Sequence, residues 1–320
     1  METSAASEGR ISAIRNGLWY GFLLVLTVWF ALVPVTGGNL PFFFYLMLWI
    51  TMASAFNIIS GFTGYLSFGY VAFYGVGAFT TAILTRKLGV SVYLALPVAG
   101  VAGVMLSLLF AKTLKLSGIY FAIVSLALAL ICQLVITNMP EEITGGSFGI
   151  SLGSEAEPVK SFYVMLATML AALATVTWLA RSRLGMALKA IRDDGEAADA
   201  MGINVPRARL TAWMLAALFP SLCGGIEAWY TNVVDTETAF DVLITAKTII
   251  YATAGGLGTV TGPVVGAVIM VGLDDLIWQS FPLLNLFLLG LAIVLLIQFM
   301  PRGIIGTLMR ARPKLRRYIL

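Results

Sequence analysis

Histidine is absent from the 320-residue sequence, which also contains only two cysteines. Without histidine, the chain cannot form a Ser-His nucleophile pair, a histidine metal centre or a histidine proton relay. Cys132 and Cys223 both lie inside apolar stretches, which favours buried packing residues over a disulfide or a metal ligand. We therefore expect no catalytic residue and no metal site in this chain.

Charge is also scarce. Charged residues make up 11% of the chain and hydrophobic residues 59%, whereas a soluble domain carries about 25% charged residues. The net charge is only +4, and the basic residues cluster beside apolar segments, so the pattern gives little support to nucleic-acid binding. This composition indicates a protein that lies in the lipid bilayer.

Apolar runs long enough to cross a bilayer recur along the chain, since a spanning helix needs about 20 apolar residues. Nothing near the first run resembles a cleavage site, so we expect a retained helix there. Residues 1–320 are thus predicted to form a single all-α domain, a polytopic transmembrane helical bundle. The predicted spans cover residues 17–35, 41–59, 66–85, 91–111, 118–138, 160–180, 209–231 and 283–300.

Basic residues predict the orientation, because they favour the cytoplasmic side of a membrane. Residues 138–160 and 235–241 are acidic and are predicted to face outward. Alternation of the spans then leaves both termini inside, with Arg86 and Lys87 as an exception that falls outside. The clusters assigned to the cytoplasmic side are Arg10 with Arg15, Lys112 with Lys115, residues 181–209 and residues 302–317.

Residues 242–272 are apolar but are interrupted by glycines, at Gly255, Gly256 and Gly258 with Thr259 beside them. Two short crossings or one re-entrant hairpin both fit the orientation, giving ten or eight crossings in all. Backbone freed from helical hydrogen bonds is tolerated at membrane depth only inside protein or along a water-filled path. The break would then face the interior, although a plain polar turn between two helices fits the pattern equally well.

A second glycine-rich stretch covers residues 61–77. It is no phosphate-binding loop, because no Gly-Lys-Ser/Thr follows it. We expect most of these glycines to serve helix packing and a few to form an unwound segment beside the substrate. The predicted substrate pathway consists of Asn57, Gly61, Gly64, Ser67, Gly69, Tyr70, Gly255, Gly256, Gly258 and Thr259.

Few charges fall within the predicted spans. Glu227 lies near the outer end of one span and Lys247 near the start of the next, where they could pair or reach water. The sequence contains no series of buried carboxylates of the kind that ion-coupled carriers commonly use. This absence weighs against an ion-coupled transporter without excluding one.

Residues 182–208 form the one strongly charged, short helical stretch, too polar to span a membrane. The residues at helical spacing that define its first predicted face are Ala187, Ala190, Ile191, Ala198 and Met201. Its opposite face is predicted to carry Lys189, Arg192, Asp193, Glu196 and Asp199. Such a helix is suited to a protein partner or to the lipid headgroups.

The motif Glu196-Ala197-Ala198-x-x-x-Gly202 resembles the EAA loop of ABC importer membrane subunits, which docks on a cytoplasmic ATPase in that family. Four longer blocks make the resemblance specific. In this order they resemble the branched-chain (hydrophobic) amino acid ABC permeases of the LivM type, over about residues 40–305. The blocks are residues 57–80, 116–126, 182–204 and 255–267.

The resemblance implies that residues 182–208 form a cytoplasmic coupling loop. The residues that it assigns to ATPase coupling are Gly185, Ala187, Ala190, Ile191, Arg192, Asp193, Asp194, Glu196, Ala197, Ala198 and Gly202. Arg192 and Glu196 would make rim contacts, and the small residues would allow close approach. A mid-helix glycine costs about 1 kcal/mol relative to alanine, so Gly195 predicts a bend.

Three positions depart from the pattern of these permeases. Tyr70 stands where the family usually has a histidine, and Tyr65 replaces a common glutamine. Both positions lie near the predicted pathway and leave the substrate open. Asp193-Asp194-Gly195 replaces an acidic-Asn-acidic run.

The resemblance also implies partners. A second homologous permease would complete a heterodimer, two cytoplasmic ATP-binding subunits would drive it, and an extracytoplasmic binding protein would deliver substrate. The chain has no P-loop, so it would bind no cofactor and ATP would lie on the partner subunits. We expect a multi-pass protein of the inner (plasma) membrane that carries branched-chain amino acids, or urea, amides or aromatic acids. An ion-coupled secondary transporter is the alternative.

Overall fold

The computed structural model describes residues 23–280 except 117, 147–148 and 154–156, together with 303–311 and a few isolated positions. The predicted span at 283–300 therefore lies almost wholly outside the described residues. So do the terminal basic residues used for orientation, Arg10, Arg15 and most of residues 302–317.

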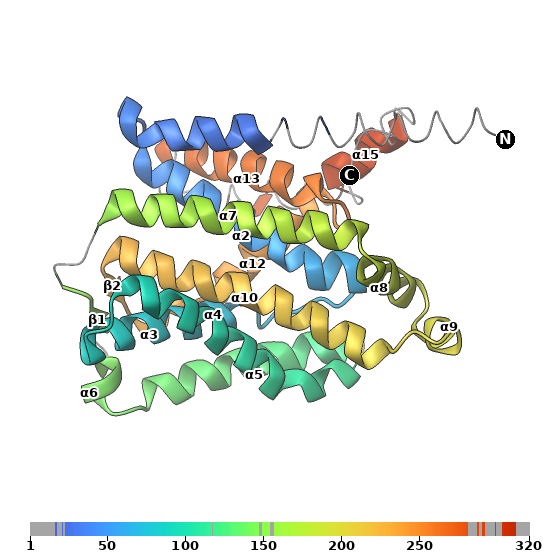
Figure 1. The fold of residues 1–320 in the computed structure, drawn as a ribbon, viewed down its shortest axis with the longest axis horizontal. Coiled ribbons are helices and arrows are strands. Elements are labelled where there is room, and N and C mark those ends of the chain that lie inside the picture. The colour runs from blue at the N-terminus through green and yellow to red at the C-terminus, as the bar shows by residue number, and fades with distance from the viewer. Residues whose placement is uncertain are drawn as a thin grey trace.

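The described chain is a bundle of helices whose axes are roughly aligned, with the chain passing back and forth along the bundle (Figure 1). Its longer helices are α2 (Leu40–Thr63), α3 (Val71–Leu88), α4 (Val92–Leu109), α5 (Ile119–Thr137), α7 (Pro158–Arg181), α10 (Val205–Thr231), α12 (Val242–Gly255) and α13 (Thr261–Ser280). The shorter elements are η1 (Phe110–Lys115), α6 (Glu141–Thr144), α8 (Arg183–Asp193), α9 (Gly195–Ala200), α11 (Thr236–Ala239) and α15 (Gly303–Ala311). An apolar helix at Leu23–Thr36 precedes them. The all-α prediction is confirmed, apart from an antiparallel pair of two-residue strands, β1 (Ile150–Ser151) and β2 (Val233–Val234).

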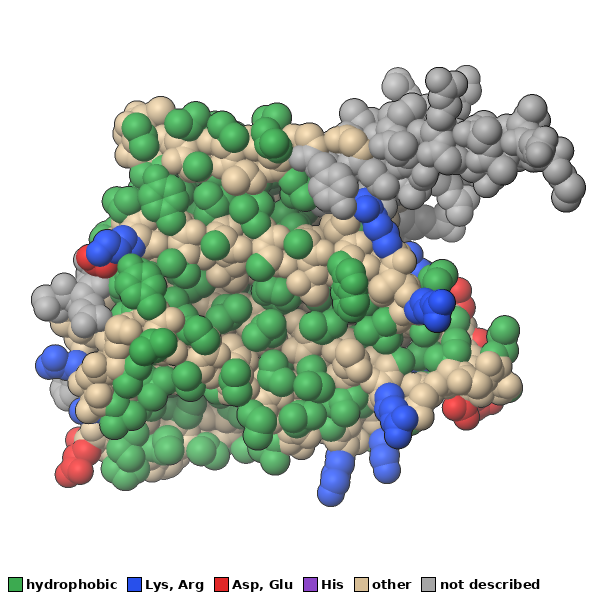
Figure 2. Space-filling view, in the orientation of Figure 1, with side chains coloured by type: hydrophobic (Ala, Val, Ile, Leu, Met, Phe, Trp, Pro, Cys, Tyr) green, Lys and Arg blue, Asp and Glu red, His purple; other side chains and the backbone are tan. Residues whose placement is uncertain are grey.

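The two ends of the bundle differ, and we name them by what they carry. The coupling end carries α8 and α9, and the sheet end carries β1, β2 and α6 (Figure 1). The predicted outward loop at 138–160 lies at the sheet end and contains α6 and β1. Charged side chains gather at the two ends, and hydrophobic side chains cover the flank between them (Figure 2).

Five described helical segments are long and apolar enough to cross a membrane. They are α2, α4 extended by η1 (Val92–Lys115), α5, α7 and α10. Within its most apolar window α2 is 78% buried, whereas α5 is 28% buried. The protein therefore has a central helix and peripheral helices, and exposed apolar side chains such as Leu94, Ile123 and Leu134 cover the outside.

Small residues let α3 and α10 pack at close range. A Cβ at Gly77 would overlap the backbone of Ser221, and one at Gly224 would overlap the backbone of Tyr74. The Ser221 hydroxyl donates a 2.9 Å hydrogen bond to the Phe73 carbonyl across the same contact. The expectation that the glycines after residue 61 serve helix packing is confirmed here.

The third predicted span begins later than expected. Residues 64–70 are not helical, because Gly64 ends α2 in the left-handed region (φ 78°) and α3 starts only at Val71. Side chains of other helices satisfy the freed backbone: Ser125 Oγ accepts from Phe68 N at 3.0 Å, and Thr245 Oγ1 accepts from Val71 N at 2.9 Å. The predicted unwound segment is therefore present and lies largely inside the protein, with Gly64 and Phe68 exposed.

The glycine break near residue 258 is a turn between two helices, not an interruption at mid-bundle. Residues 256–260 join α12 to α13 and lie against α2 and α8 at the coupling end. At about 1.5 Å per residue α13 is about 30 Å long and α12 about 21 Å, and neither is among the five segments above, so two passes and a re-entrant hairpin both stay predictions. The total number of crossings stays a prediction, since the last span lies outside the described residues.

Candidate functional site

The predicted coupling loop folds into two short helices, each started by a polar cap. Ser182 Oγ accepts a 3.0 Å hydrogen bond from Gly185 N at the start of α8. Asp194 Oδ1 accepts from the N–H groups of Glu196 and Ala197, both at 3.0 Å, at the start of α9. The predicted bend is confirmed, but its cause is the extended backbone of Asp194 (φ −157°, ψ 109°).

Glycines fix both ends of this element. Gly185 is buried, and a Cβ there would overlap the carbonyl oxygen of Leu179. The chain can therefore turn directly from α7 into α8. Gly202 has φ 84° and follows α9 with open space around it, and Asn204 Oδ1 then caps α10 by accepting from Arg207 N at 3.1 Å.

The predicted face assignment is wrong in part. Ala198 is 3% exposed and Ile191 is 3% exposed, because both pack against the core of this chain. Met201, assigned to the same face, is 84% exposed. Ala187 and Ala190 are only half-buried. Ala198 therefore contacts its own bundle and is not free to receive a partner.

The outward surface of the element is formed by other residues. Glu196 and Ala197 are exposed on α9, next to Met201 and Gly202. Asp193 is exposed at the end of α8. At the coupling end, this surface consists of one large apolar side chain, Met201, surrounded by acidic and small residues.

Arg192 makes contacts within the chain, and its rim contact with a partner stays a prediction, since 41% of its side chain is exposed. Its Nη1 donates a 2.6 Å hydrogen bond to the Gly61 carbonyl at the end of α2. The side chain lies along Gly64 and Gly258, where a Cβ would come within 3.0 Å of Arg192 Cγ and 2.8 Å of Nη1 respectively. Glycine at these positions leaves room for the arginine, which thereby joins α8 to α2.

Asn57 makes the second connection at this place. Its Oδ1 accepts from Gly258 N at 2.7 Å, and its Nδ2 donates to the Thr259 carbonyl at 2.8 Å. We call Asn57, Gly61, Arg192, Gly258 and Thr259 the inner junction. It unites α2, α8 and the α12–α13 turn, so residues predicted separately for pathway and coupling meet at the coupling end.

The other predicted pathway residues lie elsewhere. Tyr70 is fully buried and donates a 2.7 Å hydrogen bond to the Ala216 carbonyl. Ser67 is fully buried, and a Cβ at Gly69 would overlap the Ser125 carbonyl oxygen. Gly255 packs against Gly262 in the α12–α13 hairpin, and Gly256 caps α12. A contact of these residues with substrate stays a prediction.

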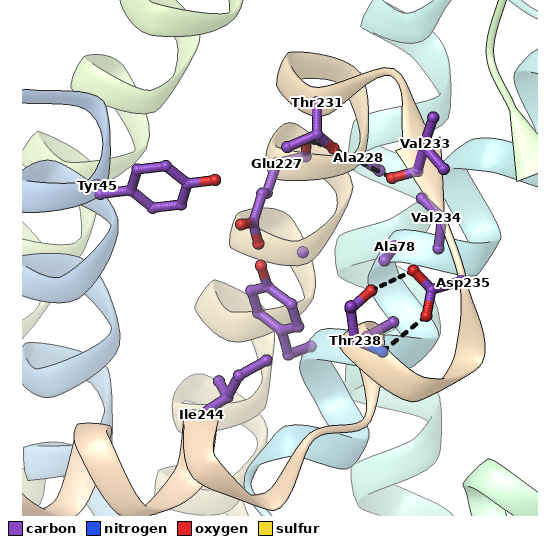
Figure 3. Close-up of a pocket in the computed structure, with 13 residues that line it drawn as sticks. Tyr45, Ala78, Glu227, Ala228, Thr231, Val233, Val234, Asp235, Thr238 and Ile244 are labelled. Atoms are coloured by element: carbon purple, nitrogen blue, oxygen red, sulfur yellow. Dashed lines mark hydrogen bonds between the residues drawn. The ribbon is translucent and has the colours of Figure 1, made fainter. Parts of the chain in front are cut away.

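A cavity of about 340 Å³ opens toward the sheet end, and no sequence pattern predicted it. Its walls come from α2, α3, α10, β2, α11 and α12 (Figure 3). Glu227 lies in its wall, and the Tyr45 hydroxyl is directed toward the Glu227 carboxylate (Figure 3). We call it the outer cavity.

The suggested pairing of Glu227 with Lys247 is wrong. Lys247 Nζ lies 2.9 Å from Asp274 Oδ2, so the ion pair joins α12 to α13. Both side chains are partly buried, at 29% and 22% exposure. Asp274 was not predicted as a partner, although a helix on each side of a glycine turn is a signal that could have suggested the pair.

Comparisons with known proteins agree with this architecture. A family model described as the permease component of the branched-chain amino acid transport system matches residues 40–297. The high-affinity branched-chain amino acid transport permease LivM of Escherichia coli is 27% identical over 95% of this chain and 78% of its own length. LivH of Salmonella typhimurium is 26% identical over 45% of this chain and 46% of its own. No solved structure matches significantly.

An archaeal protein extends the comparison. The probable branched-chain amino acid transport permease LivH of Methanocaldococcus jannaschii is 26% identical over 62% of this chain and 67% of its own length. The family match contains the coupling element, the inner junction and the outer cavity. Together with the apolar helices, it makes the chain a multi-pass membrane protein. The chain belongs to the family of branched-chain amino acid transport permeases.

Proposed function

We propose that this chain is one permease subunit of an ABC importer for branched-chain or other hydrophobic amino acids, driven by separate ATPase subunits. The observation that carries the proposal is the α8–α9 element, exposed on one side and joined to the inner junction by Arg192 on the other. The LivM and LivH names of its relatives supply the substrate class.

The proposed complex contains several chains. A second permease of the same family forms a heterodimer with this one, as the two kinds of relative, LivM and LivH, suggest. Two cytoplasmic ATP-binding subunits hold ATP, and an outer binding protein delivers the solute. The site of the complex is the inner (plasma) membrane, with the coupling end in the cytoplasm, where basic residues favour its placement.

Coupling follows from rigid contacts in this proposal. An ATPase binds the exposed surface of α9 around Met201 and displaces α8 with it. Arg192 carries the displacement to Gly61, and Asn57 carries it to the 258–259 turn. Movement of these segments opens the inner end of the bundle, as in alternating-access transport.

Purification of the tagged chain from its native membranes in mild detergent tests the composition. We expect two P-loop proteins and a second glycine-rich permease in the eluate, together with ATP hydrolysis. Recovery of the chain alone, with transport in liposomes driven by an ion gradient, would contradict the proposal and favour a secondary carrier.

A matched pair of variants tests the docking surface. Met201→Asp places a charge on the exposed side of the coupling element, and Met139→Asp makes the same change at the sheet end, where Met139 is 39% exposed. We expect Met201→Asp to lower ATPase recovery at least about tenfold, the loss for a truncated or charged interface anchor, and Met139→Asp to leave it unchanged. Equal recovery from both variants would reject the docking surface.

A further inference from the structure

We propose that the outer cavity is a binding site for the ammonium group of the transported solute, with Glu227 as its anionic partner. The inference rests on the proposed function, because it names the substrate feature that a permease would recognise. It also separates the solutes that the sequence left open: an amino acid or amine fits, whereas a solute carrying only a carboxylate does not.

The first evidence for an ammonium ligand is the charge of the cavity wall. Among the described residues that line the cavity, two are acidic, Glu227 and Asp235, and none is Lys or Arg. Lys247, the nearest basic residue along α12, lies 2.9 Å from Asp274 instead. A carboxylate in a partly apolar wall without a cation favours a positively charged ligand.

The two acids have different local partners. Asp235 caps α11: its Oδ1 accepts from Thr238 N at 2.8 Å and its Oδ2 from Thr238 Oγ1 at 2.6 Å. Both of its oxygens are therefore used within the loop. Glu227 lies about one turn before the end of α10, and its carboxylate is directed toward the Tyr45 hydroxyl (Figure 3). Asp235 is thus used within the loop, and we assign Glu227, beside the Tyr45 hydroxyl, as the acid that meets a ligand.

The second evidence is the size of the cavity and its apolar walls, which indicate the kind of solute that fits. The volume of about 340 Å³ is at the small end of the range of ligand pockets. Ala78, Ala228, Val234 and Ile244 supply apolar wall. Such a cavity suits a small solute with one ammonium and a short branched alkyl group. Urea, which carries no charge, would gain little from Glu227.

Labelling of a cysteine at the cavity mouth tests the electrostatics directly. Thr231 is exposed, lines the cavity and lies four residues after Glu227 on α10. Thr231→Cys in the full chain, with Cys132→Ala and Cys223→Ala, provides one reporter for cationic and anionic methanethiosulfonates. We expect Glu227→Gln to slow the cationic reagent about fivefold, the effect of one charge a few ångströms away in water.

Protection by ligands tests the substrate class. Leucine and isopentylamine are expected to slow the labelling of Thr231→Cys, whereas 4-methyl-2-oxopentanoate and urea are expected to leave it unchanged. Glu227→Gln should remove the protection and Glu227→Asp should retain part of it. Equal protection by the amine and the oxo acid, or protection that survives Glu227→Gln, would overturn the proposal.

Two further comparisons keep the result interpretable. Glu237→Gln makes the same change on exposed α11, outside the cavity lining, and should leave both labelling and protection unchanged. Val233→Cys, also exposed and part of the lining, repeats the test if Thr231→Cys proves unreactive. Because labelling needs no ATPase, its failure is distinct from a failure of the importer proposal, which partner recovery decides.

Discussion

At the coupling end the bundle is closed by hydrogen bonds between segments far apart in sequence, whereas at the sheet end it opens into a cavity. Asn57 and Gly258, 201 positions apart, lie 2.7 Å from each other at the coupling end. At the sheet end, six elements leave about 340 Å³ empty around Glu227. The coupling end therefore holds helices together, whereas the sheet end leaves room for a solute.

The same contrast holds for the charged side chains. Arg192 reaches a backbone carbonyl of a neighbouring helix at 2.6 Å, so its charge serves a connection within the protein. Glu227 lines a cavity instead, with no Lys or Arg among the described residues of its wall. Both features fit a transporter in which ATPases act at the coupling end and solute enters at the sheet end.

The largest expected effect is on the helix contact that joins the two ends. Gly77→Ala places a methyl group against the backbone of Ser221 between α3 and α10. We expect a loss of about 3 kcal/mol of stability, since overpacking at a rigid contact is costly. Thermal unfolding in detergent measures it. Gly272→Ala, with nothing within 4 Å of the added Cβ, is the control, and equal melting temperatures would contradict the close contact.

A smaller loss is expected from opening the inner junction. Asn57→Ala removes two hydrogen bonds and leaves Gly258 N and the Thr259 carbonyl without their partner. We expect destabilisation of about 2 kcal/mol, the cost of unpaired buried polar groups. Asn138→Ala, which removes an exposed bond to Leu134, should cost less than about 0.5 kcal/mol. Similar costs at both positions would remove the contrast between the ends.

The smallest effect on stability should be local to the coupling element. Ala198→Trp forces a large side chain into a site that is 3% exposed, whereas Met201→Trp changes a side chain that is 84% exposed. We expect Ala198→Trp to speed hydrogen exchange in α9 and its caps, with little change in global melting. Met201→Trp should leave exchange unchanged. Faster exchange in both variants would contradict the assigned faces.

Five of the predicted spans are confirmed as helices long and apolar enough to cross a membrane, because length and hydrophobicity alone specify them. It also placed the coupling element, whose motif is local. It failed on the faces of that element because the extended backbone of Asp194 interrupts the helix. A helical periodicity continued from Ile191 through this break assigns Met201 to the wrong side.

The contacts that the sequence missed join residues far apart along the chain. The inner junction connects positions 57, 61, 192 and 258, and no single spacing links them. The outer cavity is even harder to predict from sequence, because side chains from six elements form its wall. Residues 64–70 lie in the stretch that was predicted as glycine-rich. The sequence does not show that Ser125 and Thr245 accept hydrogen bonds from the backbone N–H groups of Phe68 and Val71.

The most direct test of the account is the amount of leucine taken up per ATP hydrolysed by the assembled transporter in proteoliposomes. Arg192→Ala removes the bond from α8 to Gly61 and leaves the exposed surface at Met201 in place. We expect that ATPases still bind and hydrolyse ATP, while uptake per ATP falls about fivefold for the loss of about 1 kcal/mol of hydrogen bonding. Arg207→Ala, an exposed arginine at the start of α10, serves as the charge-matched control. Unchanged uptake per ATP in Arg192→Ala would contradict the claim that this arginine carries the displacement of α8 to α2.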